Sequence, residues 1–195
     1  MAIAQDELAS NVVGQRMSLE AFLALPEESP ALEFADGMVT QKVAPQGQHS
    51  SLQSSFTQAV NDVARPPKQA LALPELRTTY SGRSRVPDVA VYLWHRIPRL
   101  ANGRIANRFT EAPDIAVEIV SPDQTASELF DKCIWYVKNG VQIALLVDPD
   151  RDTVFRFRPE SLPDVLTGDD RIDLDSVLPG FELTVSQLFA TLIVA

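Results

Sequence analysis

Two acidic residues, Asp88 and Glu118, each lie inside a run of apolar residues of the kind that forms a buried strand. Burying a carboxylate is costly unless its charge is compensated. Two carboxylates on neighbouring strands also repel each other unless one is protonated or a cation sits between them. A divalent metal would compensate both acids at once, and carboxylate oxygens favour Mg²⁺ or Mn²⁺. The pair therefore predicts a metal site built on a β-sheet.

The elements that must position these acids follow from the hydrophobic periodicity. A strand over residues 86–94 carries the first acid, and a continuously apolar strand over 115–120 carries the second. A helix over 125–139 then leads to another buried strand over 141–148. This strand–helix–strand unit predicts a right-handed crossover between two parallel strands.

The rest of the chain supplies further helices and strands. They are expected as a helix at 19–25, a hairpin at 32–40, a helix at 49–63, a strand at 70–80, a loop at 96–110, a strand at 153–158 and a helix at 185–192. Ser18 is the expected N-cap of the first helix, and Asp36-Gly37 is the hairpin turn. Together they predict an α/β (α+β) fold, a mixed sheet flanked by helices. Residues 17–195 are expected to form a single domain behind a flexible tail at residues 1–16.

The composition is that of an ordinary globular protein, with 45% hydrophobic and 22% charged residues over 195 positions. A single cysteine excludes an internal disulfide framework, and two histidines make a structural zinc site an unattractive interpretation. No run approaches the roughly 20 apolar residues of a membrane helix. The N-terminal segment also lacks the basic-then-apolar pattern of a signal peptide. We therefore expect a cytoplasmic protein without a membrane partner.

The charge distribution is uneven. The net charge of −9 argues against a general nucleic-acid coat, yet seven arginines and one histidine lie between positions 77 and 108, with a single acid among them. Such a segment predicts a phosphate-facing surface, although an ordinary exposed arginine-rich loop would give the same pattern. The candidate DNA-contacting residues are Arg77, Arg85, Arg96, Arg99 and Arg104.

An ordered set of short motifs covers nearly the whole chain from residue 18 onward. They are Leu32–Gly37, His49 at a helix start, Val86–Val89 with its Pro-Asp pair, Pro113–Pro122, Asp131-Lys132, Tyr136, Gly140-Val141, Val147–Pro149 and Leu178–Phe181. In these motifs the chain resembles the Uma-two family of restriction-endonuclease-like proteins, within the PD-(D/E)xK nuclease superfamily. The Pro-Asp pair alone is a weak signal, whereas the ordered set is specific. The resemblance implies a restriction-endonuclease-like core and a Mg²⁺-dependent endonuclease that acts on DNA.

The resemblance also implies roles for individual residues. Asp88 and Glu118 would hold the metal, which lowers the pKa of a water molecule and neutralises charge in the transition state. A lysine close by would add electrostatic stabilisation. The superfamily pattern places that lysine two residues after the glutamate, where this chain has Val120. The chain therefore departs from the standard motif at the third charged position, and the resemblance places the catalytic lysine at Lys132 instead.

Lys132 is expected on a helix that returns across the sheet. Leu129, Lys132 and Tyr136 share one face of that helix, and Leu129 indicates that this face turns inward. The ammonium would then extend over the strand ends toward Glu118. The structural alternative is a surface pair between Glu128 and Lys132 along the helix.

Other polar residues have two interpretations each. Glu33 points away from its apolar neighbours in the hairpin, and the resemblance adds it to the acidic cluster as a further metal ligand; a solvated hairpin residue is the alternative. Asp114 shares the strand face of Glu118 but lies about 13 Å along the strand, so we expect a strand-entry role. His49 is expected to cap or pack its helix, and Cys133 to be a buried apolar residue. At least one of Arg77 and Arg85 is expected in a structural ion pair.

Three functions remain open from the sequence. The first is the metal-dependent endonuclease, and the second is a nuclease-fold protein without catalysis that acts as a DNA-binding or assembly module. The third is a metal-dependent hydrolase of a small phosphate ester. A homodimer is a further prediction, because cutting both DNA strands requires two sites and residues 188–194 are very apolar, although that tail could equally pack on its own domain.

Overall fold

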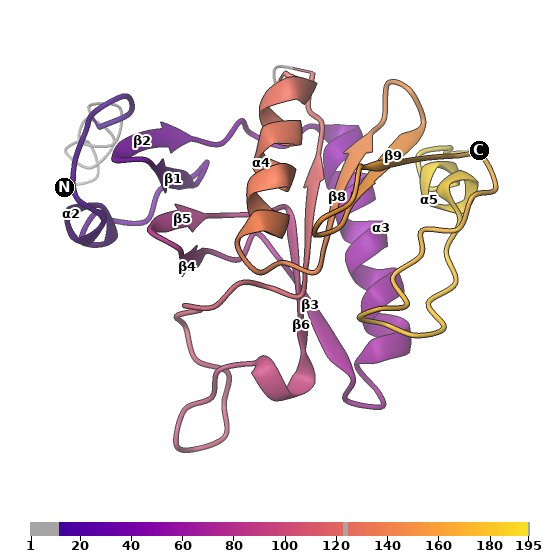
Figure 1. Ribbon diagram of the computed structural model, residues 1–195, viewed down its shortest axis with the longest axis horizontal. Coiled ribbons are helices and arrows are strands. Elements are labelled where there is room, and N and C mark those ends of the chain that lie inside the picture. Colours follow the sequence, from indigo (N-terminus) through magenta and orange to yellow (C-terminus); the bar gives the residue numbers. More distant parts are fainter. Residues whose placement is uncertain (1–11, 123–124, 195) are drawn as a thin grey trace.

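The computed structural model describes residues 12–122 and 125–194, which form two β-sheets flanked by helices (Figure 1). The larger sheet has the strand order β10-β9-β8-β7-β6-β3. Its strands are β3 (Ala70–Pro74), β6 (Val89–Leu93), β7 (Ile115–Ile119), β8 (Ile143–Asp148), β9 (Thr153–Phe157) and β10 (Asp164–Thr167). The smaller sheet has the order β2-β1-β5-β4. Its strands are β1 (Leu32–Ala35), β2 (Met38–Gln41), β4 (Thr78–Tyr80) and β5 (Arg83–Arg85).

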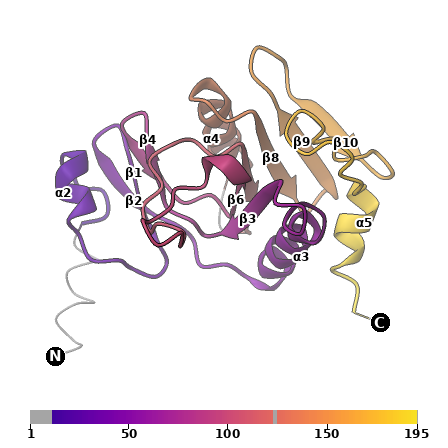
Figure 2. The ribbon, with the colours of Figure 1, turned by 90° about the horizontal axis from the view of Figure 1, so that it is seen from below.

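Helices cover both faces of the larger sheet. α3 (Gly47–Ala64) and α5 (Val185–Ala190) pack on one face, and α4 (Ala126–Lys138) packs on the other (Figure 2). The short helix α2 (Leu19–Leu23) lies beside the smaller sheet, and a 3₁₀ turn, η1 (Trp94–Arg96), follows β6. α3 and α4 carry apolar residues every three or four positions, so each presents an apolar stripe to the sheet.

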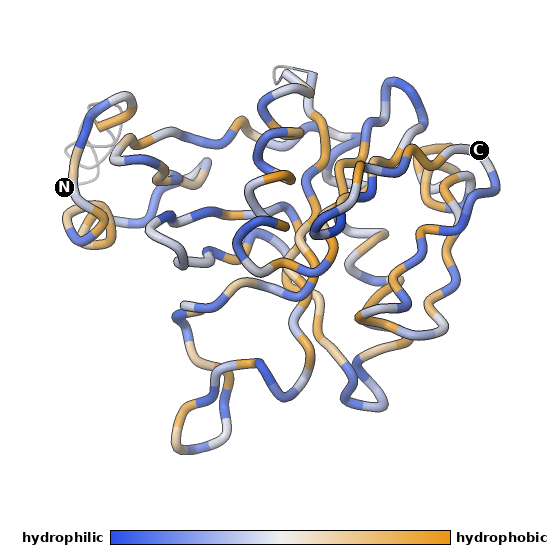
Figure 3. Tube along the Cα trace, in the orientation of Figure 1, coloured by the Kyte–Doolittle hydropathy of each residue, from blue (hydrophilic) through white to orange (hydrophobic). Residues whose placement is uncertain are grey.

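The centre of the larger sheet confirms the predicted crossover. β7 and β8 are parallel and are joined through α4. Every residue of both strands is buried, as their continuously apolar sequences predict for strands covered on two faces. Figure 3 shows apolar residues along these central strands and hydrophilic residues in the outlying loops. Glu118 is therefore a carboxylate in the most protected part of the sheet.

The predicted strand at residues 70–80 is wrong, because this segment contributes to both sheets. β3 ends at Pro74, and Glu75 then adopts a left-handed backbone with a φ of 49° before the chain enters β4. The predicted strand at 86–94 likewise begins only at Val89. Pro87 has no N–H to donate to a neighbouring strand, which explains the break.

The predicted hairpin at the N-terminal end of the chain is confirmed. Asp36 and Gly37 both have positive φ angles, 53° and 80°, as a type I′ turn requires. The Gly14 N–H donates to the Val39 carbonyl at 2.8 Å, so part of the predicted tail extends the smaller sheet. Residues 1–11 lie outside the described residues, and a flexible tail there stays a prediction.

The sequence does not predict β10. This strand pairs with β9 at the edge of the larger sheet, alternates between half-buried and exposed positions, and follows a turn-rich stretch. The predicted C-terminal helix is confirmed as α5. The predicted N-cap of α2 is also confirmed, because the Ser18 hydroxyl accepts a hydrogen bond from the Ala21 N–H at 3.1 Å. Among the described residues, no helix combines the length and the apolar content that crossing a bilayer requires.

Candidate active site

Asp88 comes directly before β6, and Glu118 lies on the neighbouring antiparallel strand β7. Val89 of β6 is paired with Val117 of β7. One step further, the same register sets Asp88 opposite Glu118, where facing Cβ atoms are about 4.5–5.5 Å apart. Asp88 Oδ2 also accepts a hydrogen bond from the Ile119 N–H at 2.7 Å. The two acids thus meet at one end of the sheet.

Glu118 is buried under α4, with 1% of its surface exposed. Its Oε1 accepts a hydrogen bond from the Tyr136 hydroxyl at 2.7 Å and lies 3.0 Å from Lys132 Nζ. Lys132 and Tyr136 stand one turn apart on α4, so the predicted inward-facing side of this helix is confirmed. The ammonium also extends to Glu118 as predicted, and the buried position of Lys132 excludes the alternative of a purely surface pair.

Glu33 holds Lys132 from the other side. Glu33 Oε1 lies 2.8 Å from Lys132 Nζ and accepts the Val86 N–H at 2.7 Å, and Oε2 pairs with Arg85 at 3.0 Å. The residue is buried, which excludes the solvated hairpin alternative. Glu33 thus positions Lys132 in this arrangement, and its role as a further metal ligand stays a prediction.

Asp88 is surrounded by donors from two further elements. Lys42 Nζ, just after β2, lies 2.6 Å from Asp88 Oδ1. His49 Nε2, in the first turn of α3, lies 3.1 Å from Asp88 Oδ2. The His49 ring is buried, in keeping with the expected packing role, but it also contacts the acid directly, a contact that the sequence did not predict. Its Nδ1 is buried without a hydrogen-bond partner among the described residues.

Lys42 brings a third carboxylate to the cluster. Its ammonium contacts both Glu75 oxygens at 3.0 Å. Gln53 Nε2 donates to Glu75 Oε1 at 3.0 Å and to the Asp88 carbonyl at 2.8 Å. Glu75 N–H donates to the same carbonyl at 3.1 Å. Lys42 therefore lies between Asp88 and a carboxylate that is itself tied to the Asp88 backbone.

The surroundings push the pKa values of the two strand acids in opposite directions. Burial raises the pKa of Glu118 to about 7; the Lys132 ammonium opposes this rise, and the nearby Asp88 adds to it. Burial also disfavours ionisation of Asp88, yet the hydrogen bond from His49 and the charge of Lys42 lower its pKa well below the usual range. Paired acids with divergent pKa values are typical of catalytic sites.

A cavity of about 300 Å³ opens beside this cluster, between α4 and the smaller sheet. Its walls include both lysines of the cluster, Lys42 and Lys132. The other lining residues are Glu33, Thr40, Gln41, Arg83, Arg85, Glu128, Leu129 and Asp131. The hollow is thus polar, and the two lysines that contact Asp88 and Glu118 line it, whereas the two acids themselves are not among its lining residues.

The comparison with known families assigns the chain directly. Residues 19–186 match the family model Uma2, whose description is "Putative restriction endonuclease". This match extends over most of the chain. The chain belongs to the Uma2 family.

A solved structure supports the same assignment. The chain is similar to the crystal structure of "a putative nuclease belonging to DUF820" from Anabaena variabilis ATCC 29413, with 40% sequence identity and a TM-score of 0.88. The similarity covers 91% of this chain and 99% of that chain. No curated protein matches the chain. The predicted fold and family are therefore confirmed, and this Uma2 protein is a member of a restriction-endonuclease-like nuclease family.

Val120, at the position of the standard superfamily lysine, is buried in the apolar cluster beneath α4. The Uma2 chain thus carries its buried lysine on the neighbouring helix, where Lys132 meets Glu118 from above the strand. A lysine at position 120 would have to enter this apolar cluster, which helps explain why the charge comes from α4.

The arginines of the loop after β6 do not contact Asp88 or Glu118. Arg96 pairs with Asp114 at 2.7 Å, and Arg99 donates to the Trp94 carbonyl at 2.9 Å. This loop leaves the C-terminal end of β6 (Figure 1), whereas Asp88 precedes the N-terminal end. Five strand residues span about 16 Å. Arg96, Arg99 and Arg104 therefore do not surround Asp88, and their contact with DNA stays a prediction.

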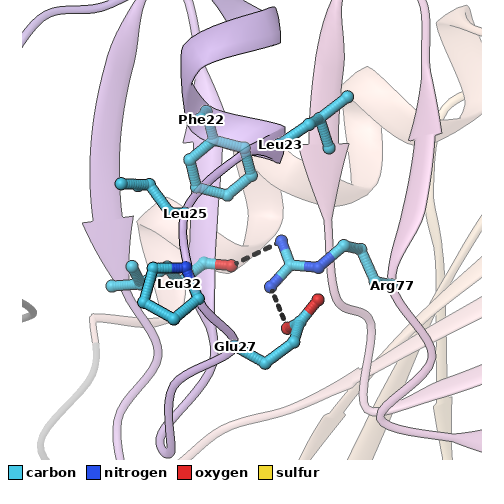
Figure 4. Close-up of a pocket in the computed structure, with 7 residues that line it drawn as sticks. Phe22, Leu23, Leu25, Glu27, Leu32 and Arg77 are labelled. Carbon is cyan, nitrogen blue, oxygen red and sulfur yellow. Dashed lines mark hydrogen bonds and ion pairs between the residues drawn. The ribbon is translucent and has the colours of Figure 1, made fainter. Parts of the chain in front are cut away.

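Arg77 has a structural role. It donates to the Leu32 carbonyl at 3.0 Å and pairs with Glu27 at 2.9 Å, beside α2 (Figure 4). The adjoining cavity, with Phe22 and Leu25 in its wall, measures about 20 Å³. That space suits about one water molecule. Of the candidate arginines, Arg85 is the one that lines the cavity beside the acids.

Asp114 has the structural role that was expected. Its carboxylate is fully buried and accepts the Leu93 N–H at 2.8 Å, and it also pairs with Arg96 and Gln142. Cys133 is buried against β8, also as expected.

Sequence reasoning missed several members of the site. Tyr136 was placed on the inward face of its helix without a role at Glu118, and Lys42, Gln53 and Glu75 were not considered. One signal was present: Lys42 is the only lysine or arginine between Arg16 and Arg65. Its position directly after the predicted hairpin could have marked it as a charge with a specific partner.

The acids provide the oxygen ligands that a hard cation prefers, but few side chains converge on one point. Within residues 12–122 and 125–194, no three His, Cys, Asp or Glu side chains converge as a ready metal cluster. Asp88 and Glu118 nevertheless offer oxygen donors to one region, and the Lys42 ammonium supplies positive charge there. A positive charge held against these acids is what a metal ion would also provide, so the pair fits a divalent cation.

Proposed function

We propose that this Uma2 protein is a Mg²⁺-dependent endonuclease that hydrolyses phosphodiester bonds of DNA. The observation that carries the proposal is the meeting of Asp88, Glu118 and Lys132 at one end of the sheet, beside a polar cavity. Family membership supports nuclease chemistry, and the two acids on adjacent strands support metal dependence.

Each residue would have a distinct role. Asp88 and Glu118 would hold Mg²⁺ or Mn²⁺, which when bound supplies charge that stabilises the transition state of phosphodiester hydrolysis. The Lys132 ammonium, which lines the cavity, adds a fixed positive charge for the phosphate. Glu33 fixes that ammonium, and Tyr136 fixes the Glu118 carboxylate by its hydrogen bond.

Nicking of supercoiled plasmid in Mg²⁺ tests the proposal. We expect Lys132→Met to slow nicking by about 100-fold or more, since removing one transition-state donor typically costs that much. Lys138→Met, an exposed lysine on the same helix, should nick at the wild-type rate. Circular dichroism of each variant separates loss of fold from loss of chemistry. Equal rates for the wild type and a folded Lys132→Met variant would contradict the proposed role.

A catalytically inactive DNA-binding or assembly module is the second candidate. The ion pair of Lys42 with Asp88 favours it, because an ammonium already neutralises one of the two acids. This candidate predicts no nicking in Mg²⁺ or Mn²⁺ at any protein concentration. It also predicts DNA affinity that is the same with and without the metal.

DNA as partner, a cytoplasmic location and a homodimer belong to the same proposal. Leu188 and Phe189 of the apolar C-terminal segment are buried in the chain's own core, whereas Ile193 and Val194 are 76% and 97% exposed. Only the end of that segment is thus available to a second copy. Gel filtration with light scattering decides, and a monomer at micromolar concentration would contradict the dimer.

A further inference from the structure

Lys42 is a buried cation held against Asp88, one of the two proposed metal ligands. Its side chain is 9% exposed, and its ammonium contacts Asp88 at 2.6 Å and Glu75 at 3.0 Å. The charge of Glu118 also acts on it. One ammonium therefore pairs with two carboxylates, and one of them, Asp88, is a proposed metal ligand.

Glu75 is built into this arrangement by a strained backbone. Its φ of 49° lies in the left-handed region, which costs a residue other than glycine free energy and is common at functional sites. The backbone turn directs its N–H to the Asp88 carbonyl, and Gln53 holds both that carbonyl and the Glu75 carboxylate. Glu75 is nevertheless 40% exposed, so burial does not require Lys42 as its counter-ion.

The two carboxylate partners of Lys42 differ in burial, and this difference indicates the direction in which its ammonium would be displaced. Asp88 is 3% exposed and needs a counter-charge, whereas Glu75 faces the solvent side. A divalent cation at Asp88 would repel an ammonium 2.6 Å from the same carboxylate. Glu75 is exposed and the Lys42 side chain lines the cavity, so an ammonium displaced from Asp88 would still have a carboxylate partner on the solvent side.

We propose that Lys42 is an internal counter-ion that competes with the divalent cation for Asp88, and that Glu75 retains the ammonium when the cation displaces it. This inference rests on the proposed function, since it takes Asp88 and Glu118 as the metal ligands. Lys42 is thus a positioning residue that sets the affinity of the site for the divalent cation.

Calorimetric titration with Mn²⁺ tests the proposal on the full chain. Lys42→Met should bind Mn²⁺ at least tenfold more tightly than wild type, because the cation no longer has to break an ion pair. Lys138→Met is the matched control and should bind as wild type does. Lys42→Gln keeps a hydrogen-bond donor without the charge and should also bind more tightly, which guards against poor folding of the methionine variant.

Glu75→Gln tests the second half of the proposal. Removing the carboxylate that retains the ammonium should leave Lys42 on Asp88, so Mn²⁺ should bind several-fold more weakly than to wild type. The same change in the Lys42→Met background should have no effect. Weaker binding in both backgrounds would instead mean that Glu75 is a metal ligand, and would overturn the proposed retention.

The outcomes separate this inference from the proposed function. Tighter binding by Lys42→Met that is lost in Lys42→Met/Asp88→Asn supports both. Equal or weaker binding by the folded Lys42→Met and Lys42→Gln variants, with a wild-type site that depends on Asp88, overturns the role of Lys42 alone. Absence of Mn²⁺ binding from wild type and from both Lys42 variants overturns both. Tighter binding that survives Asp88→Asn also overturns both, since the metal then lies elsewhere.

Discussion

Glu118 is a carboxyl group whose ionised form is disfavoured by its surroundings. Burial raises its pKa to about 7, from an unfolded value near 4.5. The folded state therefore holds a proton more tightly than the unfolded state, and this group contributes most to stability at low pH. Its contribution is lost as the pH rises from about 4.5 through about 7.

Replacing Glu118 by Gln should stabilise the metal-free protein at high pH. The amide resembles the protonated acid, so with EDTA at pH 8 we expect Glu118→Gln to raise the free energy of unfolding by about 1–3 kcal/mol. Near pH 4.5 the gain should vanish, because the wild-type carboxyl is then protonated in the folded protein. Urea unfolding at both pH values measures the difference. A variant less stable than wild type at pH 8 would contradict the assigned pKa shift.

The pKa of Glu33 is shifted in the opposite direction. Burial raises its pKa, but the charges of Lys132 and Arg85 outweigh this effect and lower the pKa to about 2. The folded state thus favours the ionised carboxylate, and its stabilising contribution is present above pH 4.5 and lost as the pH falls toward 2.

Glu33→Gln should therefore destabilise the protein at pH 7 by about 3–5 kcal/mol, since it leaves buried cations without a counter-charge. The matched control is Asp36→Asn, which breaks an ion pair between Arg83 and an exposed acid in the same sheet. That control should cost less than about 1 kcal/mol. Chemical denaturation provides both values, and similar losses for the two variants would contradict the structural importance of Glu33.

Among the elements, α4 matters most because it carries both Lys132 and Tyr136 over the sheet. It ends at Lys138, and Gly140 then adopts a φ of 104° that redirects the chain into β8. A Cβ at Gly140 would lie 3.4 Å from the Ala112 Cβ. A contact at 3.4 Å is tolerable, so the backbone conformation is what requires glycine here.

Gly140→Ala should lower the free energy of unfolding by about 1–2 kcal/mol. Gly47→Ala is the control at the start of α3, where φ is ordinary and a Cβ would meet nothing within 4 Å. That change should be neutral or stabilising by up to about 1 kcal/mol. Thermal unfolding followed by circular dichroism compares them, and an unchanged melting temperature for Gly140→Ala would contradict the requirement.

The local sequence predicted the elements with regular patterns. The parallel strands and α4 follow from continuous or helical apolar patterns, and the hairpin follows from Asp36-Gly37. The predicted strand bounds were wrong where apolar residues continue across a break between two strands. At Glu75 the backbone turns with no glycine to indicate it, because hydrogen bonds from Gln53 and to Asp88 hold the turn. Such contacts connect elements that are distant in the sequence, so the periodicity of one segment contains no sign of them.

The same reasoning explains what was found of the site. Asp88, Glu118 and Lys132 were predicted because carboxylates in apolar strands and an inward-facing lysine are locally unusual. Lys42 lies 46 positions before Asp88 in the chain, and Glu33 lies 99 positions before Lys132. Pairs this distant become neighbours only when the smaller sheet packs beside α4.

At the scale of the whole molecule, the surface that would receive DNA follows from the cavity rather than from the loop after β6. Arg83 lines the cavity and stacks on Trp135, with its guanidinium 4.8 Å from the ring centre. Arg99 and Arg104 belong to the loop at the far end of β6. A duplex that places a phosphate near Lys132 would thus pass Arg83 first.

Arg83→Gln should lower the slope of log affinity for DNA against log salt by about 1, as loss of one phosphate contact requires. Arg99→Gln and Arg104→Gln should leave that slope unchanged. Fluorescence anisotropy with a labelled duplex at several salt concentrations, in Ca²⁺ to prevent cleavage, measures it. A fall in slope for the loop variants with none for Arg83→Gln would return the DNA-contacting role to the loop.

A crystal soaked in Mn²⁺ tests most directly whether one divalent cation joins the two strand acids. The anomalous difference map should contain one strong peak within coordination distance of carboxylate oxygens from both Asp88 and Glu118, with Lys132 Nζ close to it and not bonded to it. A fully soaked crystal with no peak there, or with a peak held by other residues, would contradict the metal-dependent nuclease.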